Sequence, residues 1–265
     1  MSLFLHSLSI NSYTVLVVRC RHYSVESQLF IGGSTMKILA TVLVIIICAS
    51  PALHAQKDGF EGRPITENLF MQTGNTLHAK EFIIGIGPIA YGITENFQIG
   101  TNVLLYLFQY INADLKYSLM DCESQAFALG LGFGSLNLSV GGGDISFISL
   151  SPYVAYTTAI SSKTRLHLNG NYSYFEGDAD IEDAEAIASA SGTSISAGIE
   201  QSVSNRTKFV ADVGYDITFE GLRVGGGVLL GWEVFRLKVG VQYFAPKDVD
   251  GLVLPYVGLW WRFDG

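Results

Sequence analysis

The chain has 265 residues, of which 49% are hydrophobic and only 15% charged, and its mean hydropathy is +0.33. A soluble domain usually carries about 25% charged residues, so this composition is typical of a membrane protein. Helical membrane proteins need roughly 18 consecutive apolar residues per span, whereas every apolar run after residue 55 is short and interrupted. The composition therefore excludes a helix bundle, a coiled coil and a disordered chain, and indicates β-structure.

The first 55 residues differ from the rest of the chain. Met36 and Lys37 precede a short apolar stretch, residues 38–47, and small residues precede Gln56. This is the pattern of a secretory signal peptide, so residues 36–55 are predicted to be a cleaved signal. Residues 1–35 show no periodicity. We interpret them as a non-native upstream extension, with a genuine long leader as the alternative.

The remaining domain, residues 56–265, is acidic. Removing residues 1–55 takes away three of the 16 basic and one of the 24 acidic side chains, which leaves a net charge of −10. Nucleic acid is not an expected partner, because binding it requires a clustered positive face. Cys122 is the one cysteine in this region, so neither an intrachain disulfide nor a metal site built from cysteines can form. No cofactor is predicted.

Strict alternation of apolar and polar residues predicts several β-strands. The clearest runs are residues 111–119, 166–174, 208–219 and 237–243. The longer ones exceed the usual globular strand of about 5–6 residues. They match the roughly 9–11 residues that a tilted strand needs to cross a bilayer.

The connections between these runs predict an up-and-down topology. Short polar turns alternate along the chain with a second set of connections, one of them long and acidic. Barrels of the outer membrane place short turns in the periplasm and longer loops outside. The short set lies at residues 94–96, 121–124, 161–163, 204–206 and 233–235, and the second set at 108–110, 140–144, 176–191, 219–222 and 245–251.

This assignment predicts an all-β fold, a single antiparallel up-and-down transmembrane barrel of about twelve strands. A first strand near residues 68–73 precedes a strand at about 77–93, and the last strand covers 252–263. The weak points are the first strand and the very short 108–110 connection, so ten strands is the alternative. Aromatic residues gather at the predicted strand ends, with Tyr110 and Phe244 at the outer rim and Trp232 and Trp261 at the periplasmic rim. Such aromatic girdles are typical of membrane barrels.

The end of the chain resembles the C-terminal β-signal of bacterial outer-membrane barrels. Tyr256, Gly258, Trp261 and Phe263 match that pattern position by position, although Asp264 and Gly265 follow the final aromatic residue. The resemblance implies export to the outer membrane of a bacterium, outer-membrane lipid as surroundings, and recognition of the last strand by the barrel-assembly machinery. It identifies no functional family, and the oligomeric state stays open.

The predicted alternation also identifies side chains that face the barrel interior. In a wide barrel such charged groups line water, and in a narrow one they pair with each other as a polar core. The leading hypothesis is a passive pore for small polar solutes or ions, and the alternative is a plugged structural or surface-interaction barrel whose outer loops contact ligands. The candidate lumen-lining residues are Asp114, Lys116, Arg165, His167, Glu200, Lys208, Asp212, Asp216, Arg223, Arg236, Lys238 and Arg262.

Two further kinds of site have weaker support in the sequence. Within the predicted loop 176–191, Asp178, Asp180, Glu182 and Asp183 are close enough to suggest a cation site, but the glycine-containing calcium loop is absent and a solvated loop is the better interpretation. An outer-membrane hydrolase is the remaining alternative. His167 is predicted to face inward at mid-strand, and no nucleophile and acid accompany it at a recognisable spacing. No catalytic residue is therefore predicted, and the chain is not expected to be an enzyme.

Overall fold

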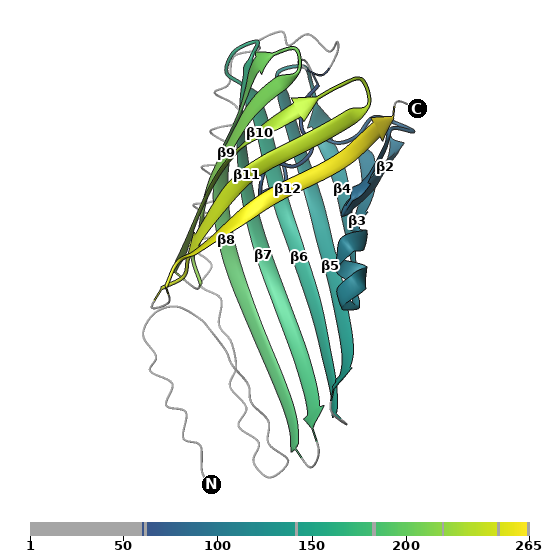
Figure 1. The fold of residues 1–265 in the computed structure, drawn as a ribbon, viewed down its shortest axis with the longest axis vertical. Helices are drawn as coiled ribbons and strands as arrows, with labels where there is room; N and C mark the ends of the chain where they lie inside the picture. The colour runs from purple at the N-terminus through teal and green to yellow at the C-terminus, as the bar shows by residue number, and fades with distance from the viewer. Residues whose placement is uncertain are drawn as a thin grey trace.

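The computed structural model describes residue 60 and residues 63–140, 143–181, 184–218, 220–247 and 250–263. The expected leader and signal peptide lie outside these residues. The described chain forms a closed antiparallel barrel of twelve strands, in which successive strands pair with each other and the first pairs with the last (Figure 1). The predicted fold class is confirmed, with twelve strands rather than ten.

The strands differ greatly in length. The first three have five to seven residues, whereas the strands from the fifth to the eighth have 16 to 21. Among the described residues, no helix is long and apolar enough to cross a membrane. The elements are β1 (Phe82–Ile86), β2 (Pro88–Thr94), β3 (Phe97–Asn102), the 3-10 helix η1 (Val103–Phe108), β4 (Tyr110–Asp121), β5 (Gln125–Val140), β6 (Gly143–Ala159), β7 (Thr164–Ile181), β8 (Ala184–Ser204), β9 (Thr207–Asp216), β10 (Gly221–Gly231), β11 (Phe235–Ala245) and β12 (Leu252–Phe263).

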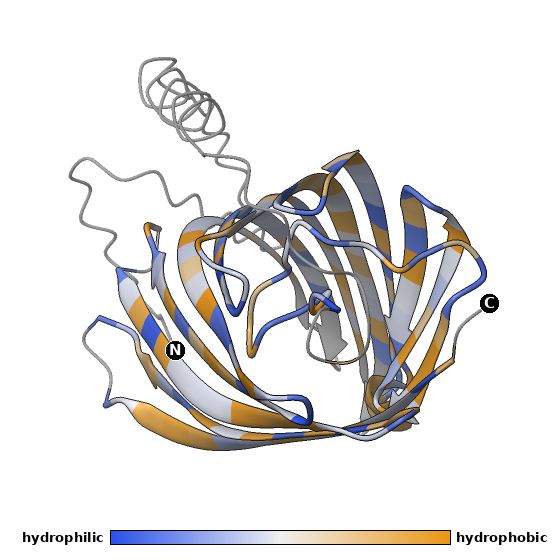
Figure 2. Ribbon diagram, turned by 90° about the horizontal axis from the view of Figure 1, so that it is seen from above, coloured by the Kyte–Doolittle hydropathy of each residue, from blue (hydrophilic) through white to orange (hydrophobic). Residues whose placement is uncertain are grey.

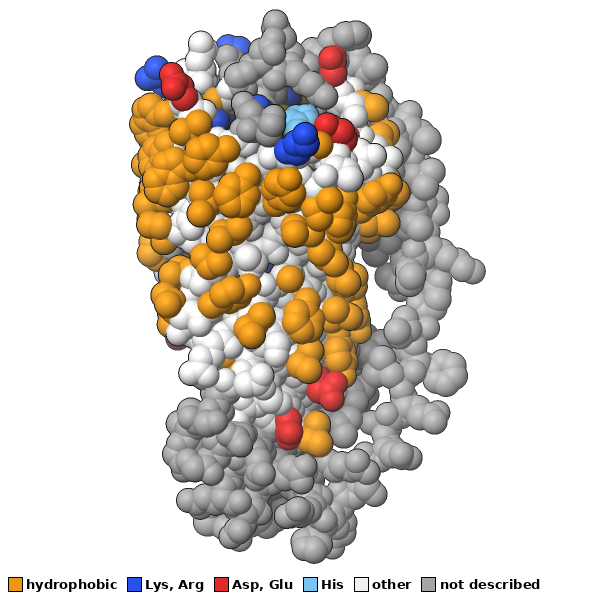
Figure 3. Space-filling view, turned by 90° about the vertical axis from the view of Figure 1, so that its right-hand side faces the viewer, with side chains coloured by type: hydrophobic (Ala, Val, Ile, Leu, Met, Phe, Trp, Pro, Cys, Tyr) orange, Lys and Arg blue, Asp and Glu red, His pale blue; other side chains and the backbone are white. Residues whose placement is uncertain are grey.

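Each strand turns one face inward and the other outward, as the period of two requires. In β9 the polar residues Lys208 and Asp212 are buried, while Phe209 and Val213 on the opposite face are 51% and 47% exposed. Figure 3 shows the resulting band of apolar side chains around one side of the barrel, with charged side chains at its two ends. This inversion of the usual arrangement suits a barrel surrounded by lipid.

The expected first strand, residues 68–73, is wrong. Residues 63–81, called the plug below, instead cross the interior of the barrel (Figure 2), and their one described β-bridge joins Glu67 and Gln72. Leu69 and Leu77 of the plug are 2% and 0% exposed. Asn68, directly before Leu69, is also 0% exposed, whereas a membrane-spanning strand would turn one of two consecutive side chains outward.

The single strand predicted at about 77–93 is in fact a hairpin of two strands, β1 and β2. Gly87 has a φ of +111°, which favours glycine, and Pro88 begins the next strand. The chain therefore turns between β1 and β2, which pair through Phe82 with Tyr91 and Ile84 with Ile89. One expected strand is lost and one is gained, so the count of twelve is unchanged.

The long acidic connection expected at 176–191 is wrong as well, because most of it is strand. β7 and β8 continue their pairing from Thr164 opposite Gln201 to Ile181 opposite Ala184. The abundant Ala, Ser and Gly of this segment keep a period of two that supports pairing despite its acidic residues. As Figure 1 shows, β5 to β8 extend as a tall sheet beyond the rest of the barrel.

The aromatic rims are present only in part. At the end of the barrel near the C-terminus, Phe235 packs against Trp232 and Trp261 with ring centroids 5.4 and 5.5 Å apart. Two aromatic residues expected at the outer rim point inward instead. The Tyr110 hydroxyl lies 2.8 Å from Ser149 Oγ, and the Phe244 ring lies below the Arg223 guanidinium.

Candidate functional site

Charged side chains of the wall bind the main chain of the plug. Since the plug has almost no regular secondary structure, its peptide groups need partners from elsewhere. Four cations donate to its carbonyl oxygens. Lys116 binds Thr66 and Asn75 at 2.7 and 3.1 Å, Lys238 binds Asn68 and Glu67 at 2.8 and 3.2 Å, Lys208 binds Arg63 at 2.5 Å, and Arg262 binds Pro64 at 3.4 Å.

Acceptors on the wall satisfy the N–H groups of the same segment. Asp212 Oδ2 accepts hydrogen bonds from the backbone N–H groups of Leu69 and Phe70, both at 2.9 Å. Gln98 Oε1 accepts one from Leu77 at 2.9 Å. Polar and charged side chains of the wall therefore bind both donors and acceptors of the plug main chain.

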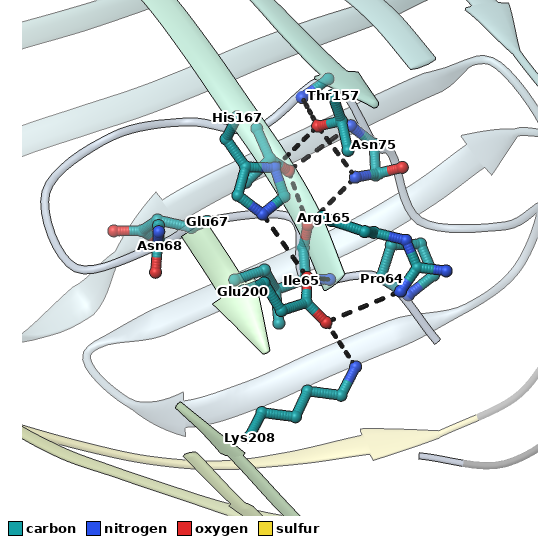
Figure 4. Close-up of polar contacts among 12 residues, drawn as sticks. Pro64, Ile65, Glu67, Asn68, Asn75, Thr157, Arg165, His167, Glu200 and Lys208 are labelled. Atoms are coloured by element: carbon teal, nitrogen blue, oxygen red, sulfur yellow. Dashed lines mark hydrogen bonds and ion pairs between the residues drawn. The ribbon is translucent and has the colours of Figure 1, made fainter. Parts of the chain in front are cut away.

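A buried charge cluster centred on Glu200 lies beside the plug (Figure 4). The carboxylate is 2.6 Å from Lys208 Nζ, 3.8 Å from Arg165 Nη1 and 3.5 Å from His167 Nε2. Glu200 Oε2 also accepts a 3.4 Å hydrogen bond from the backbone N–H of Ile65 in the plug. A carboxylate shared among three cationic or donor groups and a peptide N–H is compensated in spite of its burial.

The contacts of Thr157 fix the orientation of the His167 ring. Thr157 Oγ1 accepts hydrogen bonds from Gly74 N and Asn75 Nδ2 in the plug, at 2.9 and 3.2 Å. Both lone pairs of that oxygen are thereby used, so its proton is donated to His167 Nδ1, 2.9 Å away. His167 Nε2 then carries the ring proton and faces Glu200. This chain of contacts ties β6, β7 and β8 to the plug.

Cation–π contacts hold Phe60, which precedes the plug in the chain. The Phe60 ring lies 5.0 Å from Lys208 Nζ and 4.8 Å from the Arg236 guanidinium carbon. Gly231 faces the same ring so closely that a Cβ there would approach it to 2.3 Å. Cation–π contacts of this kind gain strength where water is excluded, so Phe60 anchors the chain at the end of the barrel near the C-terminus.

A second anchor lies where the plug enters β1. Glu81 is 1% exposed and accepts hydrogen bonds from Arg262 Nη2 and Arg63 Nη1, both at 3.0 Å, and from the His78 backbone N–H at 2.9 Å. Burial by itself would raise the pKa of Glu81. The hydrogen bond and charge of Arg262, with smaller contributions from His78 and Arg63, outweigh it and hold the pKa below the ordinary 4.5.

The described residues leave two larger spaces in the lumen beside the plug. A cavity of about 270 Å³ separates the plug from β1 to β4 and from β10 to β12, and its lining combines apolar Leu229 and Trp260 with charged Glu67, Asp114 and Lys238. A second space of about 180 Å³ lies between the plug and β6 to β8, lined mainly by Ser and Asn side chains. The larger cavity is close to the lower size limit of small-molecule sites, roughly 300 Å³.

The structure gives the twelve candidate lumen residues different roles. Six of them, Lys116, Glu200, Lys208, Asp212, Lys238 and Arg262, bind the plug main chain, and Arg165 and His167 support Glu200. Arg236 binds carbonyl oxygens of the turn before β11, and Asp114 accepts from the Tyr153 hydroxyl at 3.0 Å. Asp216 and Arg223 lie 3.7 Å apart at the far end of β9 and β10.

The other residues predicted from sequence lie away from this site, apart from one. In β12, Tyr256 lines the larger cavity, whereas Trp261 and Phe263 are about 40% exposed on the outside and Gly258 is buried. Asp178 and Asp180 of the suggested cation loop belong to β7, and Glu182 and Asp183 lie outside the described residues. The described residues contain no group of three His, Cys, Asp or Glu that could hold a metal.

Sequence reasoning missed the plug itself. Its interactions run mainly through backbone groups, which leave no pattern of side chains. Two signals were available, namely Glu81 directly before an apolar strand and Gly87-Pro88 within one. Comparison of the chain with protein-family models and with curated proteins finds no match.

Proposed function

We propose that this protein is an integral β-barrel of a bacterial outer membrane that is closed along its axis by its own plug and uses its lumen as a binding chamber. Export through a cleaved signal, insertion by the barrel-assembly machinery through Tyr256, Gly258, Trp261 and Phe263, and an outward apolar band are consistent parts of this proposal. The fold supplies the scaffold, and function is assigned from the lumen.

The observation that carries the proposal is how the interior charges are used. A water-filled pore leaves such groups facing solvent, where they set ion preference. Here Lys116, Lys208 and Lys238 are 0–3% exposed and directed at plug carbonyl oxygens. The same side chains that would line a channel therefore hold the segment that fills it.

Conductance of single molecules in a planar bilayer tests this proposal. The folded protein, checked by its mobility shift on heating in a gel, is expected to give no sustained current steps. The double variant Asp212→Asn/Lys238→Met removes two anchors of the plug and is expected to give intermittent openings. Asp178→Asn, which removes a charge from an exposed position, is the matched control and should stay silent. Steady steps of the unaltered protein that scale with salt would contradict the closed barrel.

The second candidate is passage of small polar solutes or ions after the plug moves. It is favoured by the polar contacts that hold the plug, since hydrogen bonds and ion pairs can exchange with water more readily than an apolar core can. The Ser- and Asn-lined space of about 180 Å³ on one side of the plug also suits water. Conductance of the double variant with a reproducible ion selectivity would support this candidate.

We also infer that the chain is not an enzyme. Thr157, His167 and Glu200 follow one another in the order hydroxyl, imidazole, carboxylate, but Thr157 and His167 are 2% and 0% exposed. The threonine oxygen already accepts two hydrogen bonds from the plug. A nucleophile needs access to its substrate and a free attacking oxygen, so this arrangement supports a structural role.

A further inference from the structure

The barrel wall is incomplete on one side of β12. β1 pairs with β12 only from Ile86 opposite Leu259 to Phe82 opposite Phe263. Residues 252–258 of β12 pair with β11, but they have no ladder partner on their other side among the described residues. Pro255, which cannot donate to a ladder and is confined to strand edges, lies in this half. Figure 1 shows β12 meeting the β2 side near the C-terminus and diverging from η1 and β4 away from it.

On the opposite side of this opening, the side chain of Asn112 connects β4 to the end of β3. The ladder between β3 and β4 ends at Gly100 opposite Asp114. Beyond it, Asn112 Oδ1 accepts from the Asn102 backbone N–H at 2.7 Å, and Asn112 Nδ2 donates to the Asn102 carbonyl oxygen at 2.9 Å. The Asn112 amide thus takes the place of a peptide group between two strands that have already separated.

The larger cavity reaches this opening. Its lining includes three runs of consecutive strand residues, 88–90, 100–102 and 112–114. These runs lie at the ends of β2 and β3 and near the start of β4, and the lining also includes Tyr256 of the unpaired half of β12, so the cavity borders the opening. On the inside it ends at charged Glu67, Asp114 and Lys238.

Large hydrophobic side chains are strongly exposed around the opening. The six most exposed large hydrophobic side chains in the described residues all lie on η1 or on the adjoining ends of β1, β4 and β12, and they are 59% to 76% exposed. They are Leu107, Phe108, Val257, Ile86, Val253 and Ile111. The inward-facing Leu252 and Leu254 of the unpaired edge are 54% and 45% exposed as well, in a lumen whose other side chains are largely polar.

From these observations we propose that the opening between β12 and β4 is a lateral portal, through which a single-chain amphiphile enters the cavity from the membrane. The proposal rests on the proposed membrane location. Its chain would lie against the apolar edge of β12, Tyr256 and Trp260, while its polar head would reach the mixed charges at the inner end. A water-soluble ion fits less well, because the mouth is apolar and Lys238 is already bonded to the plug.

Photocrosslinking tests the portal. The folded protein in phosphatidylcholine nanodiscs is incubated with palmitoyl-lysophosphatidylcholine carrying a diazirine at the chain end, and labelled peptides are identified by mass spectrometry. Labelling is expected inside the barrel, at the two aromatic residues of β12 that would contact the chain, Tyr256 and Trp260. Ala113→Trp places an indole at the portal and should lower that labelling by about tenfold, equivalent to ~1.4 kcal/mol. Ala211→Trp, at an exposed outward position of β9, is the matched control and should change nothing.

A second variant keeps the test decisive if Ala113→Trp does not fold. Asn112→Ala removes the bridging amide and should increase the rate of interior labelling. Label confined to outward-facing peptides, or interior labelling that neither variant alters, would overturn the portal. Steady ionic currents from the unaltered protein would instead overturn the closed barrel, so failure of the two proposals is distinguishable.

Discussion

At the scale of single residues, the interior polar groups act as partners for a chain rather than for solvent. Lys238 illustrates this, since its ammonium donates to two plug carbonyls and lies 5.3 Å from the rings of both Tyr256 and Trp260. Without the plug, the Lys238 ammonium would still face these rings but would lose its hydrogen bonds to the plug carbonyls. Each such residue therefore couples the position of the plug to the stability of the wall.

Glu81 gives the clearest residue-scale prediction. Glu81→Gln leaves Arg262 and Arg63 without their carboxylate, and loss of one partner of a buried pair costs roughly 3 kcal/mol. The free energy of unfolding in urea, measured in detergent at pH 7, should fall by about that amount. Glu95→Gln, at a side chain 70% exposed, is the control and should leave it unchanged. An equal effect of both substitutions would refute the role of Glu81 as an anchor.

The pH dependence of stability follows from the same group. The pKa of Glu81 is lower in the folded protein than the ordinary 4.5, so its contribution is fully present above about pH 4.5 and is lost as the pH falls through the folded-state pKa. The unaltered protein should therefore lose stability in that acidic range, and the Glu81→Gln variant should lose less. Parallel curves for the two proteins, measured as urea midpoints, would count against the charge on Glu81 as the cause.

At the scale of elements, the short β1–β2 hairpin determines where the barrel closes. Its turn depends on Gly87, whose φ of +111° few other residues adopt. If β1 and β2 formed one continuous strand, β12 would have no antiparallel partner at the place where the barrel closes. The hairpin also sets how far β1 reaches along β12, and therefore where the unpaired edge begins.

Replacing Gly87 tests this dependence. Gly87→Ala should destabilise the barrel by about 1–3 kcal/mol, the usual cost of a strained backbone conformation. Gly226→Ala is the control, because nothing lies within 4 Å of a Cβ at that position of β10. The measurement is again the urea midpoint of the folded protein in detergent. A neutral Gly87→Ala variant would mean that the turn tolerates another conformation.

The strands that the sequence predicted well are those whose two faces differ in polarity. In β9, an exposed apolar face and a buried, largely polar face produce a strict alternation that reveals both strand and orientation. The strand expected at 68–73 had a different basis, because it was placed to start the barrel on the periplasmic side, and its consecutive apolar residues Leu69, Phe70 and Met71 do not alternate. Gly87 was hidden since the apolar residues before and after it read as one strand. The partners of Lys116 or Asp212 were not predictable, because main-chain groups leave no trace in sequence.

At the scale of the whole molecule, the plug fills much of the barrel interior, where alternation alone suggested a water-filled lumen. Peptide groups in irregular backbone normally exchange their protons rapidly, but within residues 63–78 five N–H groups donate to side chains of the wall and four more donate to acceptors within the plug. Hydrogen exchange should therefore be slow across this segment, at rates comparable to those of the strands. The irregular turn at 161–163, which is exposed, is the internal reference and should exchange quickly. Fast exchange throughout residues 63–78 would show that the plug leaves the lumen in solution.

In the membrane that we propose for this barrel, the unequal height of the wall has a consequence for the surrounding lipid. A tilted strand needs about 9–11 residues to cross the hydrocarbon layer, and β1 to β3 have only five to seven. A bilayer meeting a hydrophobic surface shorter than itself becomes thinner there. The lipid beside β1 to β3 should accordingly be compressed and poorly packed, whereas that beside β5 to β8 should retain its full thickness. The barrel would thus impose a permanent asymmetry on its own annulus of lipid, with the weakest packing at one fixed point of the circumference.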